Sequence, residues 1–451
     1  MKARKDSIAF CGFVYGDEGK GRLVDEYVHE YSKTKKVILY RDNGGSNAGH
    51  TVEVGDIRIA LHQLPSGVFG KNTTIVLGKG MVIHPGDLLE EINQVKNVSG
   101  GNVTATIKID IMATMSLDTH RAFEGVLKQW QEGGKGSTGR GISPAYSDIL
   151  LRHPIRMRDL VNWNEEKIRA HYKLYDAWIK GLGGNLASMD VNSLTGASNV
   201  KVGTEDEFIK RLKVQIDQLK VYVEDVFDML HAAWQNEKEY AFIFEKSQAI
   251  GLDPRFGVYP DVTASDTTFT GITSSTEGAI DAFEIENRTG VMKATYMSSV
   301  GARKLPSLVT GELADKIRED AKEYGATTKR PRDIAFLDLP ALRFFAKVGY
   351  VTHLAATHMD IVYPNTPIKI CVAYELNGKQ VTYRPDQEFL LKVKPIYTEL
   401  PTWDQKAIQL AKSYKEMPKE AQTFLEFLSK EIGLPFLMVT TGPKREQSIR
   451  F

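Results

Sequence analysis

The chain of 451 residues is long enough for a large hydrophobic core, and 42% hydrophobic and 25% charged residues are ordinary proportions for a globular protein. The formal net charge of +1 gives no overall field that would gather DNA or RNA, so we expect no nucleic-acid partner. The two cysteines, Cys11 and Cys371, lie in apolar strand-like runs, which favours buried thiols in a reducing cytosol over a disulfide framework or a zinc site. The N-terminal apolar run is too short for a signal sequence or a membrane span, so we expect a cytoplasmic protein without membrane contact.

A glycine-rich loop, residues 14–22, follows an apolar run at residues 8–13 and precedes a segment with helical spacing of apolar residues. Such a strand-to-helix loop suits phosphate, because glycines let the backbone approach a ligand and the helix start offers free N–H groups. Lys20 adds a mobile positive charge. Asp17 is unusual, since phosphate repels a carboxylate unless a metal bridges them or the carboxylate has its own chemistry. The spacing differs from that of the ordinary phosphate loop, so a polar turn is the alternative.

A second glycine-rich loop, residues 41–51, follows a predicted strand at residues 37–40 and carries His50. A single histidine in a loop is often only a surface residue. Open α/β sheets, however, bind ligands at the carboxyl ends of their strands, and histidine exchanges protons near neutral pH. His50 is therefore a candidate for proton transfer.

The next segments alternate between short strands at residues 57–83, a helix from Pro85, and mostly helical sequence at residues 160–235. A third glycine-rich stretch, residues 133–141, reads either as a flexible linker or as a phosphate contact through its threonine and arginine. The basic cluster that includes Arg152 is either functional or a solvated face.

Further polar segments follow the later predicted strands. The strand at residues 241–244 ends in a polar exit at residues 245–248, and residues 261–268 form an exposed hydroxyl-rich loop that either binds a ligand or makes turns. Residues 324–332 gather three cationic groups and two hydroxyls, and arginines suit carboxylate or phosphate contacts. Asp360 comes just after the strand at residues 353–357, where a carboxylate can accept two hydrogen bonds from a purine.

The C-terminal part reads as a hairpin followed by helices and a strand. Asn377-Gly378 predicts a hairpin between strands at residues 368–374 and 380–383. Helices near residues 404–414 and 418–432 then lead to a strand at residues 436–439. The loop at residues 440–443 lies at the end of that last strand.

Five motifs in this order resemble those of the adenylosuccinate synthetase family. They are residues 15–21, 47–51, 137–146, 325–328 and 441–443. The resemblance implies one large α/β domain over residues 1–451, with a mostly parallel central β-sheet flanked by helices, related to phosphate-loop proteins, and with helical and small β subregions. It also implies a helix-rich insertion at about residues 85–235 and a base-recognition part at about residues 350–451.

The resemblance implies a ligase that joins L-aspartate to IMP through 6-phosphoryl-IMP, while GTP becomes GDP and phosphate, with Mg²⁺ as cofactor and a homodimer as the assembly. Asp17 would remove the N1 proton of IMP, His50 would support phosphoryl transfer, and Lys20 and Gln248 would complete the catalytic set. Asp17 and the Gly49 carbonyl would hold Mg²⁺.

The same resemblance assigns binding residues. Those matched to IMP are Asn47, Ser137, Thr138, Gln248, Thr263 and, reaching across the dimer, Arg152; those matched to L-aspartate are Thr327, Thr328 and Arg330. Arg332 matches the arginine shared between the aspartate loop and the γ-phosphate of the donor. Those matched to the nucleotide donor are Gly16, Glu18, Gly19, Lys20, Gly21, Gly49, His50, Thr51, Arg332, His358, Asp360, Thr440, Gly442 and Pro443.

Several residues depart from the family pattern. Tyr15 replaces the usual tryptophan, Arg22 a lysine, and Ala302-Arg303-Lys304 a small glycine-containing stretch, while Pro331 and Asp333 interrupt an arginine-rich run. His358 replaces a lysine in the guanine-recognition motif, which leaves GTP and ATP both open as donor.

Two other functions remain alternatives on the sequence. One is a related synthetase that joins L-aspartate to dGMP, although that branch tends to lose the residue at Asp17, so its retention favours IMP. The other is a nucleotide-binding regulator without turnover, which would not need both Asp17 and His50.

Overall fold

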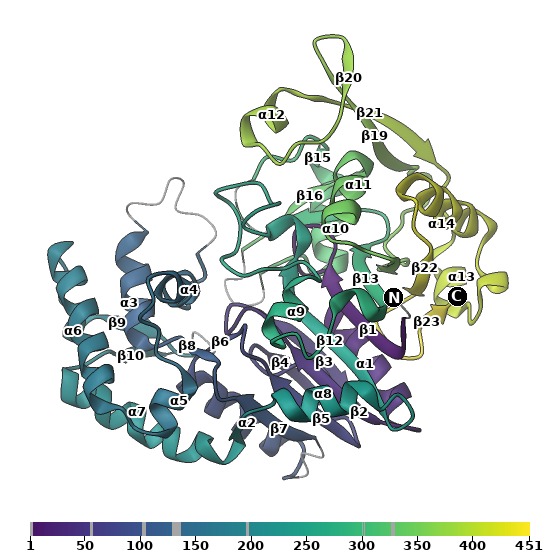
Figure 1. Cartoon of the computed structure of the whole chain (residues 1–451). Coiled ribbons are helices and arrows are strands. Elements are labelled where there is room, and N and C mark those ends of the chain that lie inside the picture. Colours follow the sequence, from purple (N-terminus) through teal and green to yellow (C-terminus); the bar gives the residue numbers. More distant parts are fainter. Residues whose placement is uncertain are drawn as a thin grey trace.

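A ten-stranded sheet organises the chain in the computed structural model (Figure 1). The structure describes residues 3–54, 57–101, 105–128, 137–194, 198–299, 301, 303–325 and 330–451. In spatial order the strands of the sheet are β11 (Val223–Glu224), β7 (Thr106–Asp110), β5 (Thr73–Leu77), β2 (Lys36–Arg41), β12 (Tyr240–Ala249), β1 (Arg4–Gly12), β13 (Ile285–Lys293), β18 (His353–Thr357), β22 (Phe436–Thr440) and β23 (Ser448–Arg450). Neighbouring strands are parallel except for the antiparallel pair β22 and β23.

The central strands are apolar along their whole length because both faces of the sheet are covered. Alternate residues of β1 belong to different hydrophobic cores: Ile8 and Phe10 pack in one, and Ala9 and Cys11 in the other. Successive side chains of a strand point to opposite faces, so these two cores lie on the two sides of the sheet. Helix α1 (Lys20–Tyr31) packs against β1, β2 and β12 on one side.

Most helices between residues 85 and 235 lie to one side of the sheet (Figure 1). They are α2 (Pro85–Val98), α3 (Asp118–Leu127), α4 (Ile142–Leu150), α5 (Met157–Val161), α6 (Glu165–Gly181), α7 (Glu205–Leu219) and α8 (Phe227–Gln235). Short strand pairs accompany them: β6 (Val82–Ile83) with β8 (Thr114–Met115), and β9 (Asp190–Asn192) with β10 (Asn199–Lys201). Strands β7 and β11 from the same stretch join the main sheet, so the proposed insertion is interleaved with it.

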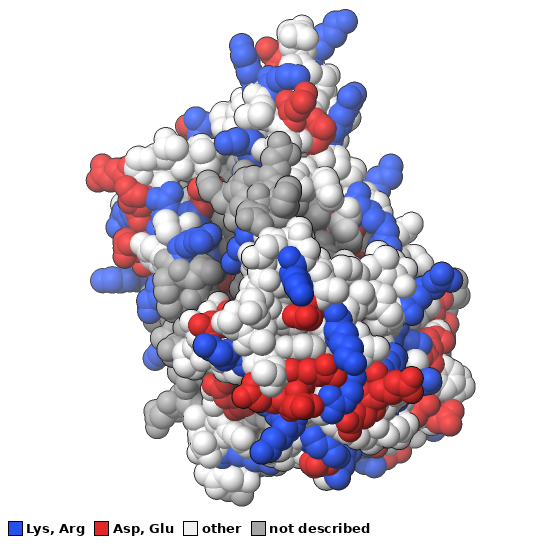
Figure 2. Space-filling view, turned by 90° about the vertical axis from the view of Figure 1, so that its left-hand side faces the viewer, with Lys and Arg blue, Asp and Glu red and all other residues white. Residues whose placement is uncertain are grey.

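The surface of this helical side carries charges of both signs. Figure 2 looks at the side that holds α6 and α7 and shows basic side chains interspersed with a band of acidic ones. Arg169 of α6 is 2.9 Å from carboxylate oxygens of Glu165, Glu205 and Asp206. A single arginine therefore bridges three carboxylates, and acidic charge remains in excess at this point of the surface.

The C-terminal half adds helices and small sheets around the far end of the main sheet. Its helices are α9 (Gly271–Ser275), α10 (Glu312–Ala321), α11 (Leu339–Val348), α12 (Gln387–Lys392), α13 (Gln405–Leu410) and α14 (Lys419–Ile432). Its small strands are β14 (Met297–Ser299), β15 (Leu308–Val309), β16 (Asp333–Ala335), β17 (Leu337–Asp338), β19 (Ile368–Leu376), β20 (Lys379–Val381) and β21 (Lys394–Leu400). The hairpin predicted at Asn377-Gly378 is confirmed: β19 and β20 are antiparallel, and both turn residues have positive φ.

Some local expectations were wrong. His50 does not lie in a loop, because it begins β3 (His50–Val54), which pairs with β4 (Ile57–Leu61). The polar exit expected at residues 245–248 continues β12, because Glu245 and Lys246 are buried among charged partners. The loop at residues 261–268 is not wholly exposed, since Ser265 and Thr267 are buried. Strand β23 was not predicted.

In the part of the chain that the structure describes, no helix combines the length and apolar character needed to cross a bilayer.

Candidate active site

The carboxyl ends of neighbouring parallel strands bring the predicted site residues to one edge of the sheet. Strands β2, β12, β1, β13, β18 and β22 are consecutive in the sheet, and the glycine-rich loops that follow β1 and β2, Gln248, His358, Asp360 and residues 440–443 lie at the ends of five of them. Ligands of open α/β sheets bind at this edge. Residues that are more than 400 positions apart in the sequence are therefore neighbours in the fold.

The loop after β1 contains two residues in a backbone conformation that glycine adopts readily and other residues rarely adopt. Gly16 and Gly19 have φ values of 101° and 83°, and Gly19 immediately precedes α1. The buried Glu18 carboxylate accepts hydrogen bonds from the backbone N–H groups of Val14 (3.2 Å) and Gly16 (2.7 Å). Lys20 lies 3.3 Å from the same carboxylate. The Glu18 side chain thus shapes the loop from inside and balances Lys20.

Asp17 stands apart from this inner network. Its φ is 57°, its side chain is 42% exposed, and its Oδ2 forms an ion pair with the guanidinium of Arg332. Arg332 also donates to buried Glu323 at 2.7 Å. Burial alone would lower the pKa of Arg332, but the two carboxylates raise it. Asp17 is thus a half-exposed carboxylate that already holds a cation.

His50 is oriented by a buried carboxylate. Its Nδ1 lies 2.6 Å from Glu245 Oε1, and Ser66 donates to Glu245 through both its N–H and its hydroxyl at 2.7 Å. Although burial would raise the pKa of Glu245, His50, Arg41 and Ser66 lower it to about 2. A carboxylate on Nδ1 fixes the ring orientation and leaves Nε2 for chemistry. A Cβ placed on Gly21 would lie 3.4 Å from the His50 Cβ, so His50 packs against the first turn of α1.

Gln248 has the marks of a ligand-binding amide. It has a φ of 61°, its Oε1 accepts from Ser265 at 3.2 Å, and its buried Nε2 has no hydrogen-bond partner among the described residues. A buried donor without a partner calls for an explanation, and a bound ligand supplies one. Nearby, Asn47 Oδ1 accepts from the Gly45 N–H at 3.1 Å, and the Thr263 N–H donates to the Leu252 carbonyl at 2.8 Å.

The residues matched to IMP in the helical part divide into two groups. Ser137 donates to Glu124 at 2.8 Å, and Thr138, which follows it, is exposed. Tyr146 of α4 accepts from the Gly44 N–H at 3.0 Å, which ties this helix to the loop after β2. Arg152, in contrast, is exposed beyond the end of α4.

Arg140 does not offer its guanidinium to a phosphate. It is buried and donates to the carbonyls of Ser193 (2.5 Å) and Leu194 (2.7 Å). The expectation that this arginine contacts phosphate was wrong, because its side chain connects two segments of the scaffold.

The residues matched to the base of the donor meet between β18 and β22. The His358 N–H donates to Thr440 Oγ1 at 3.2 Å, and its Nδ1 lies 3.2 Å from the Tyr296 hydroxyl. Burial lowers the pKa of His358. Asp360 is half-buried, and its Oδ2 accepts from Gln409 at 3.1 Å.

The loop that follows β22 is tied to α1. The Gly442 carbonyl, just before Pro443, accepts from Arg22, which also donates to the Gln447 carbonyl at 2.8 Å. The arginine at this position thus joins the C-terminal loop to the helix that follows the phosphate loop.

The structure gives limited information on four further predicted site residues. Thr327 and Thr328 lie outside the described residues. Arg330 is exposed, and its carbonyl accepts from the Gly325 N–H at 2.8 Å. Thr51 belongs to β3, directly after Gly49 and His50.

Sequence reasoning missed the partner carboxylates Glu245 and Glu323. Glu245 carried a usable signal, because it directly extends the apolar run of residues 241–244 and a carboxylate there is buried and must be paired. Glu323 lies just after α10 and carried no comparable signal.

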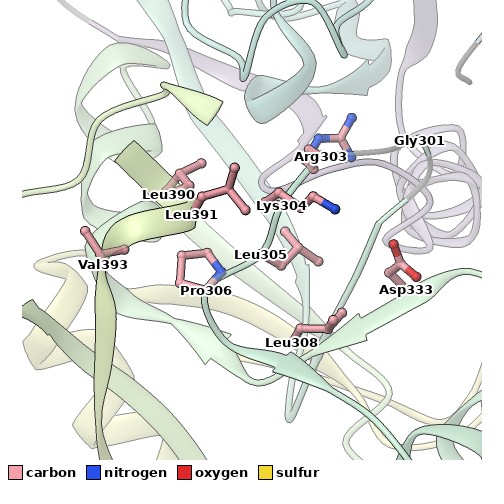
Figure 3. A pocket seen from close by; sticks show the side chains of 10 residues that line it. All are labelled: Gly301, Arg303, Lys304, Leu305, Pro306, Leu308, Asp333, Leu390, Leu391 and Val393. Carbon is pink, nitrogen blue, oxygen red and sulfur yellow. The ribbon is translucent and has the colours of Figure 1, made fainter. Parts of the chain in front are cut away.

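A cavity of about 310 Å³ lies between residues 303–308 and α12 (Figure 3). Its lining combines apolar side chains of Leu305, Leu390 and Leu391 with charged Lys304 and Asp333. None of the predicted site residues is among the described residues that line it.

A cluster of metal-ligating residue types lies in the helical part, at His120, Asp148 and His171, with ligand atoms within 4.8 Å of one another. His120 Nδ1 accepts the Leu117 N–H at 2.8 Å, which places its proton on Nε2, 3.0 Å from Asp148. Tyr175 donates to the same carboxylate at 2.7 Å. His171 Nε2 lies 2.8 Å from the Thr119 hydroxyl, and its buried Nδ1 has no hydrogen-bond partner among the described residues. The hydrogen bonds of His120, Asp148 and Tyr175 connect α3, α4 and α6.

The profile of the adenylosuccinate synthetase family matches residues 9–449. The chain belongs to this family. An adenylosuccinate synthetase of Clostridium novyi (strain NT) is 33% identical over 448 residues, covering 98% of each chain, and one of Clostridium botulinum (strain Eklund 17B / Type B) is 35% identical over 451 residues, covering 97% of each.

Solved structures agree with this assignment. The fully ligated adenylosuccinate synthetase from Plasmodium falciparum superposes with a TM-score of 0.85 at 28% identity and covers 99% of this chain and 100% of that one. A cyanophage S-2L succinoaminodeoxyadenylate synthetase bound to dGMP and dATP matches with a TM-score of 0.59 at 18% identity, covering 99% and 95%, and this likeness extends to the fold alone.

The predicted family, the mostly parallel α/β fold and the C–N ligase activity are thereby confirmed. As an adenylosuccinate synthetase family member, the chain is a GTP-binding ligase of purine biosynthesis. The family takes IMP, L-aspartate and GTP as substrates and uses a divalent metal.

Proposed function

We propose that this chain joins L-aspartate to IMP through 6-phosphoryl-IMP, using Asp17 as the base. The observation that carries this proposal is the half-exposed Asp17 carboxylate inside a phosphate-type loop, together with the buried pair of His50 and Glu245, in which His50 packs against the first turn of α1 after that loop. A loop that only bound phosphate would gain nothing from an anionic side chain. A carboxylate with a proton to accept explains its presence.

In the first step Asp17 accepts the N1 proton of IMP, and the electron pair of that bond makes O6 anionic. O6 then forms a bond to the γ-phosphorus of GTP, the bond to the bridging oxygen breaks, and GDP leaves with the electron pair. Lys20 and the N–H groups at the start of α1 are placed to meet the charge on the phosphates.

His50 assists this transfer through Nε2. Its Nδ1 faces the Glu245 carboxylate at 2.6 Å, which orients the ring and leaves Nε2 for the ligand. In the proposed transfer, Nε2 is the His50 atom that hydrogen-bonds to the moving phosphoryl group. In the second step the amino group of L-aspartate attacks C6, the C6–O6 bond breaks and phosphate leaves with that electron pair. The proton lost by the amino nitrogen passes to the leaving phosphate, and Asp17 releases its proton to water. Arg330 and Arg332 bind the substrate carboxylates.

Mg²⁺ fits this site by the chemistry of its donors. A carboxylate at Asp17 and a carbonyl at Gly49 are the hard oxygen ligands that Mg²⁺ prefers. The Arg332 guanidinium on Asp17 is a positive group at the same carboxylate. When bound, Mg²⁺ supplies positive charge to the phosphate oxygens of the donor.

We assign GTP as the donor because of Asp360. Guanine presents N1–H and N2–H donors to a carboxylate, whereas adenine lacks that pair of donors. Asp360 is half-buried next to Thr440 and the loop at residues 441–443, with Gln409 bound to Oδ2. We therefore propose that Asp360 selects the base of the donor and that His358 has a secondary role in this choice.

We propose a homodimer in which Arg152 reaches the partner's IMP site. Leu150 and Leu151, just before Arg152, are 84% and 58% exposed. Two adjacent exposed leucines beside a functional arginine fit an interface with a second copy. We place the protein in the cytoplasm on the two free buried thiols, Cys11 and Cys371. The base-recognition part at residues 350–451 and the insertion at residues 85–235 stay predictions.

Phosphate release with Mg²⁺ and each substrate set tests the proposed function. We expect release only when IMP, L-aspartate and GTP are all present, with one adenylosuccinate formed per phosphate, and slower turnover with ATP or with dGMP in place of IMP. Release that does not depend on L-aspartate, or a preference for dGMP, contradicts the proposal.

A further inference from the structure

Glu323 is a buried carboxylate that has no role in the proposed reaction. It lies between the loop that carries Asp17 and the region around His358. Its side chain is 1% exposed. Its Oε2 accepts from Arg332 at 2.7 Å, and its Oε1 accepts from the Tyr296 hydroxyl at 2.6 Å and from Lys293. Both oxygens are therefore engaged, one toward Arg332 and the other toward Tyr296.

The two sides of Glu323 lead to different parts of the site. On one side Arg332 forms the ion pair with Asp17 after β1. On the other side the Tyr296 hydroxyl lies 3.2 Å from Nδ1 of His358, after β18. A continuous series of polar contacts thus joins the catalytic loop to the region that binds the donor base.

The charges of this series balance. Glu323 and Asp17 contribute two negative charges, and Lys293 and Arg332 contribute two positive charges. When a metal and IMP engage Asp17, Arg332 keeps one carboxylate partner in Glu323 and its other face becomes available to a substrate anion. Glu323 thereby keeps Arg332 in place while its outer partner changes.

We propose that Glu323 is the positioning residue for Arg332, and that Tyr296 couples it to His358, so that binding of the donor and of L-aspartate depend on one another. This inference rests on the proposed function, because it assigns a support to Arg332 in that reaction. A positioning residue acts through another group, so its loss changes substrate constants rather than only the stability of the fold.

The test compares Glu323→Gln, Tyr296→Phe and the double variant with the full-length protein, using Glu319→Gln as the matched control. Glu319 is an exposed glutamate of α10, four positions before Glu323. We expect Glu323→Gln to raise the KM for L-aspartate and lower kcat, together by about 10- to 100-fold in kcat/KM, as is usual for residues that orient a functional group. Glu319→Gln keeps wild-type constants.

Tyr296→Phe separates coupling from a purely structural role. We expect it to weaken GTP binding, measured by calorimetry with Mg²⁺, and also to raise the KM for L-aspartate, because the hydroxyl contacts both His358 and Glu323. In the double variant the loss in kcat/KM is smaller than the product of the two single losses.

Two results would overturn the inference. One is wild-type KM values in both single variants with only a lower melting temperature, and the other is multiplicative losses in the double variant. The calorimetric measurement needs no turnover, so it remains informative if the assay with IMP and L-aspartate fails and thereby contradicts the proposed function instead. If Glu323→Gln does not fold, Tyr296→Phe still tests the inference, because this variant removes only one oxygen. Its affinity for GTP and its KM for L-aspartate then decide the result.

Discussion

At the scale of single residues, the central group is the Asp17 carboxylate, which pairs with Arg332. The loop holds this carboxylate half-exposed and in contact with Arg332, and nothing in the loop itself requires an acid. In the proposed reaction its carboxylate oxygen receives a proton. Removing that acceptor while keeping the shape of the side chain isolates its role.

Asp17→Asn is expected to lower kcat by about 10²- to 10⁴-fold, the range for a lost general base. Phosphate release under saturating substrates measures it. Asp6→Asn is the matched control, because Asp6 lies at the other end of β1 and also has a positive φ, 53°. Full activity of Asp17→Asn would show that Asp17 is not the general base.

Glu245 gives stability a specific dependence on pH. Its pKa is about 2 in the folded chain, below the ordinary 4.5, so its contribution is complete above about pH 4.5 and is lost as the pH falls toward 2. The shift corresponds to about 3 kcal/mol at neutral pH. We expect the free energy of unfolding of wild type to fall more steeply between pH 5 and about 3 than that of Glu245→Gln, measured by urea denaturation. Parallel curves would contradict this assignment.

Local motifs in the sequence predicted candidate site residues, but they did not predict the buried carboxylates that contact those residues. Asp17, His50 and Gln248 lie in or beside motifs with their own local pattern. Glu245 meets His50 across almost 200 positions, and Glu323 meets Arg332, nine positions later in the chain. Such contacts depend on strand register and side-chain packing, which local pattern does not encode.

At the scale of elements, the junction between β1 and α1 depends on the absence of a side chain at Gly12. A Cβ there would lie 2.3 Å from Glu18 Oε2, 2.6 Å from the Gln248 carbonyl and 2.7 Å from the Ala249 Cβ. The end of β1 therefore approaches the end of β12 closely enough to place the loop and Gln248 together.

Gly12→Ala is expected to destabilise the fold by about 1–3 kcal/mol and to reduce activity, because two backbone segments and the Glu18 carboxylate must shift. Gly181→Ala serves as control: a Cβ at this position at the end of α6 meets nothing within 4 Å, so no loss of stability is expected. Urea denaturation of both variants checks the pair. Equal stability of the two would show that the close approach is not maintained.

The order of strands and helices was largely predictable, because apolar runs and turn residues mark them. The hairpin at Asn377-Gly378 and the helix from Pro85 were predicted from such signals. The extension of β12 through Glu245 and Lys246 was not, since charged residues end a strand unless a partner such as Asp42 neutralises them inside the protein.

At the scale of the whole molecule, the proposed dimer places Arg152 in the partner's site. Two inactive variants, Arg152→Ala and Asp17→Asn, then complement each other after mixing, because a mixed dimer contains one site with both residues intact. Random exchange gives about a quarter of wild-type activity, since half of the dimers are mixed and half of their sites are intact. Continued inactivity of a mixture whose subunits exchange would place Arg152 outside the shared site.

The central claim is that O6 of IMP receives the γ-phosphoryl group before L-aspartate enters. IMP labelled with ¹⁸O at position 6 tests it directly, with mass spectrometry of the released phosphate. The account predicts that each phosphate released carries the label, and that Asp17→Asn releases little labelled phosphate. Unlabelled phosphate, formed at the same rate as adenylosuccinate, would contradict it.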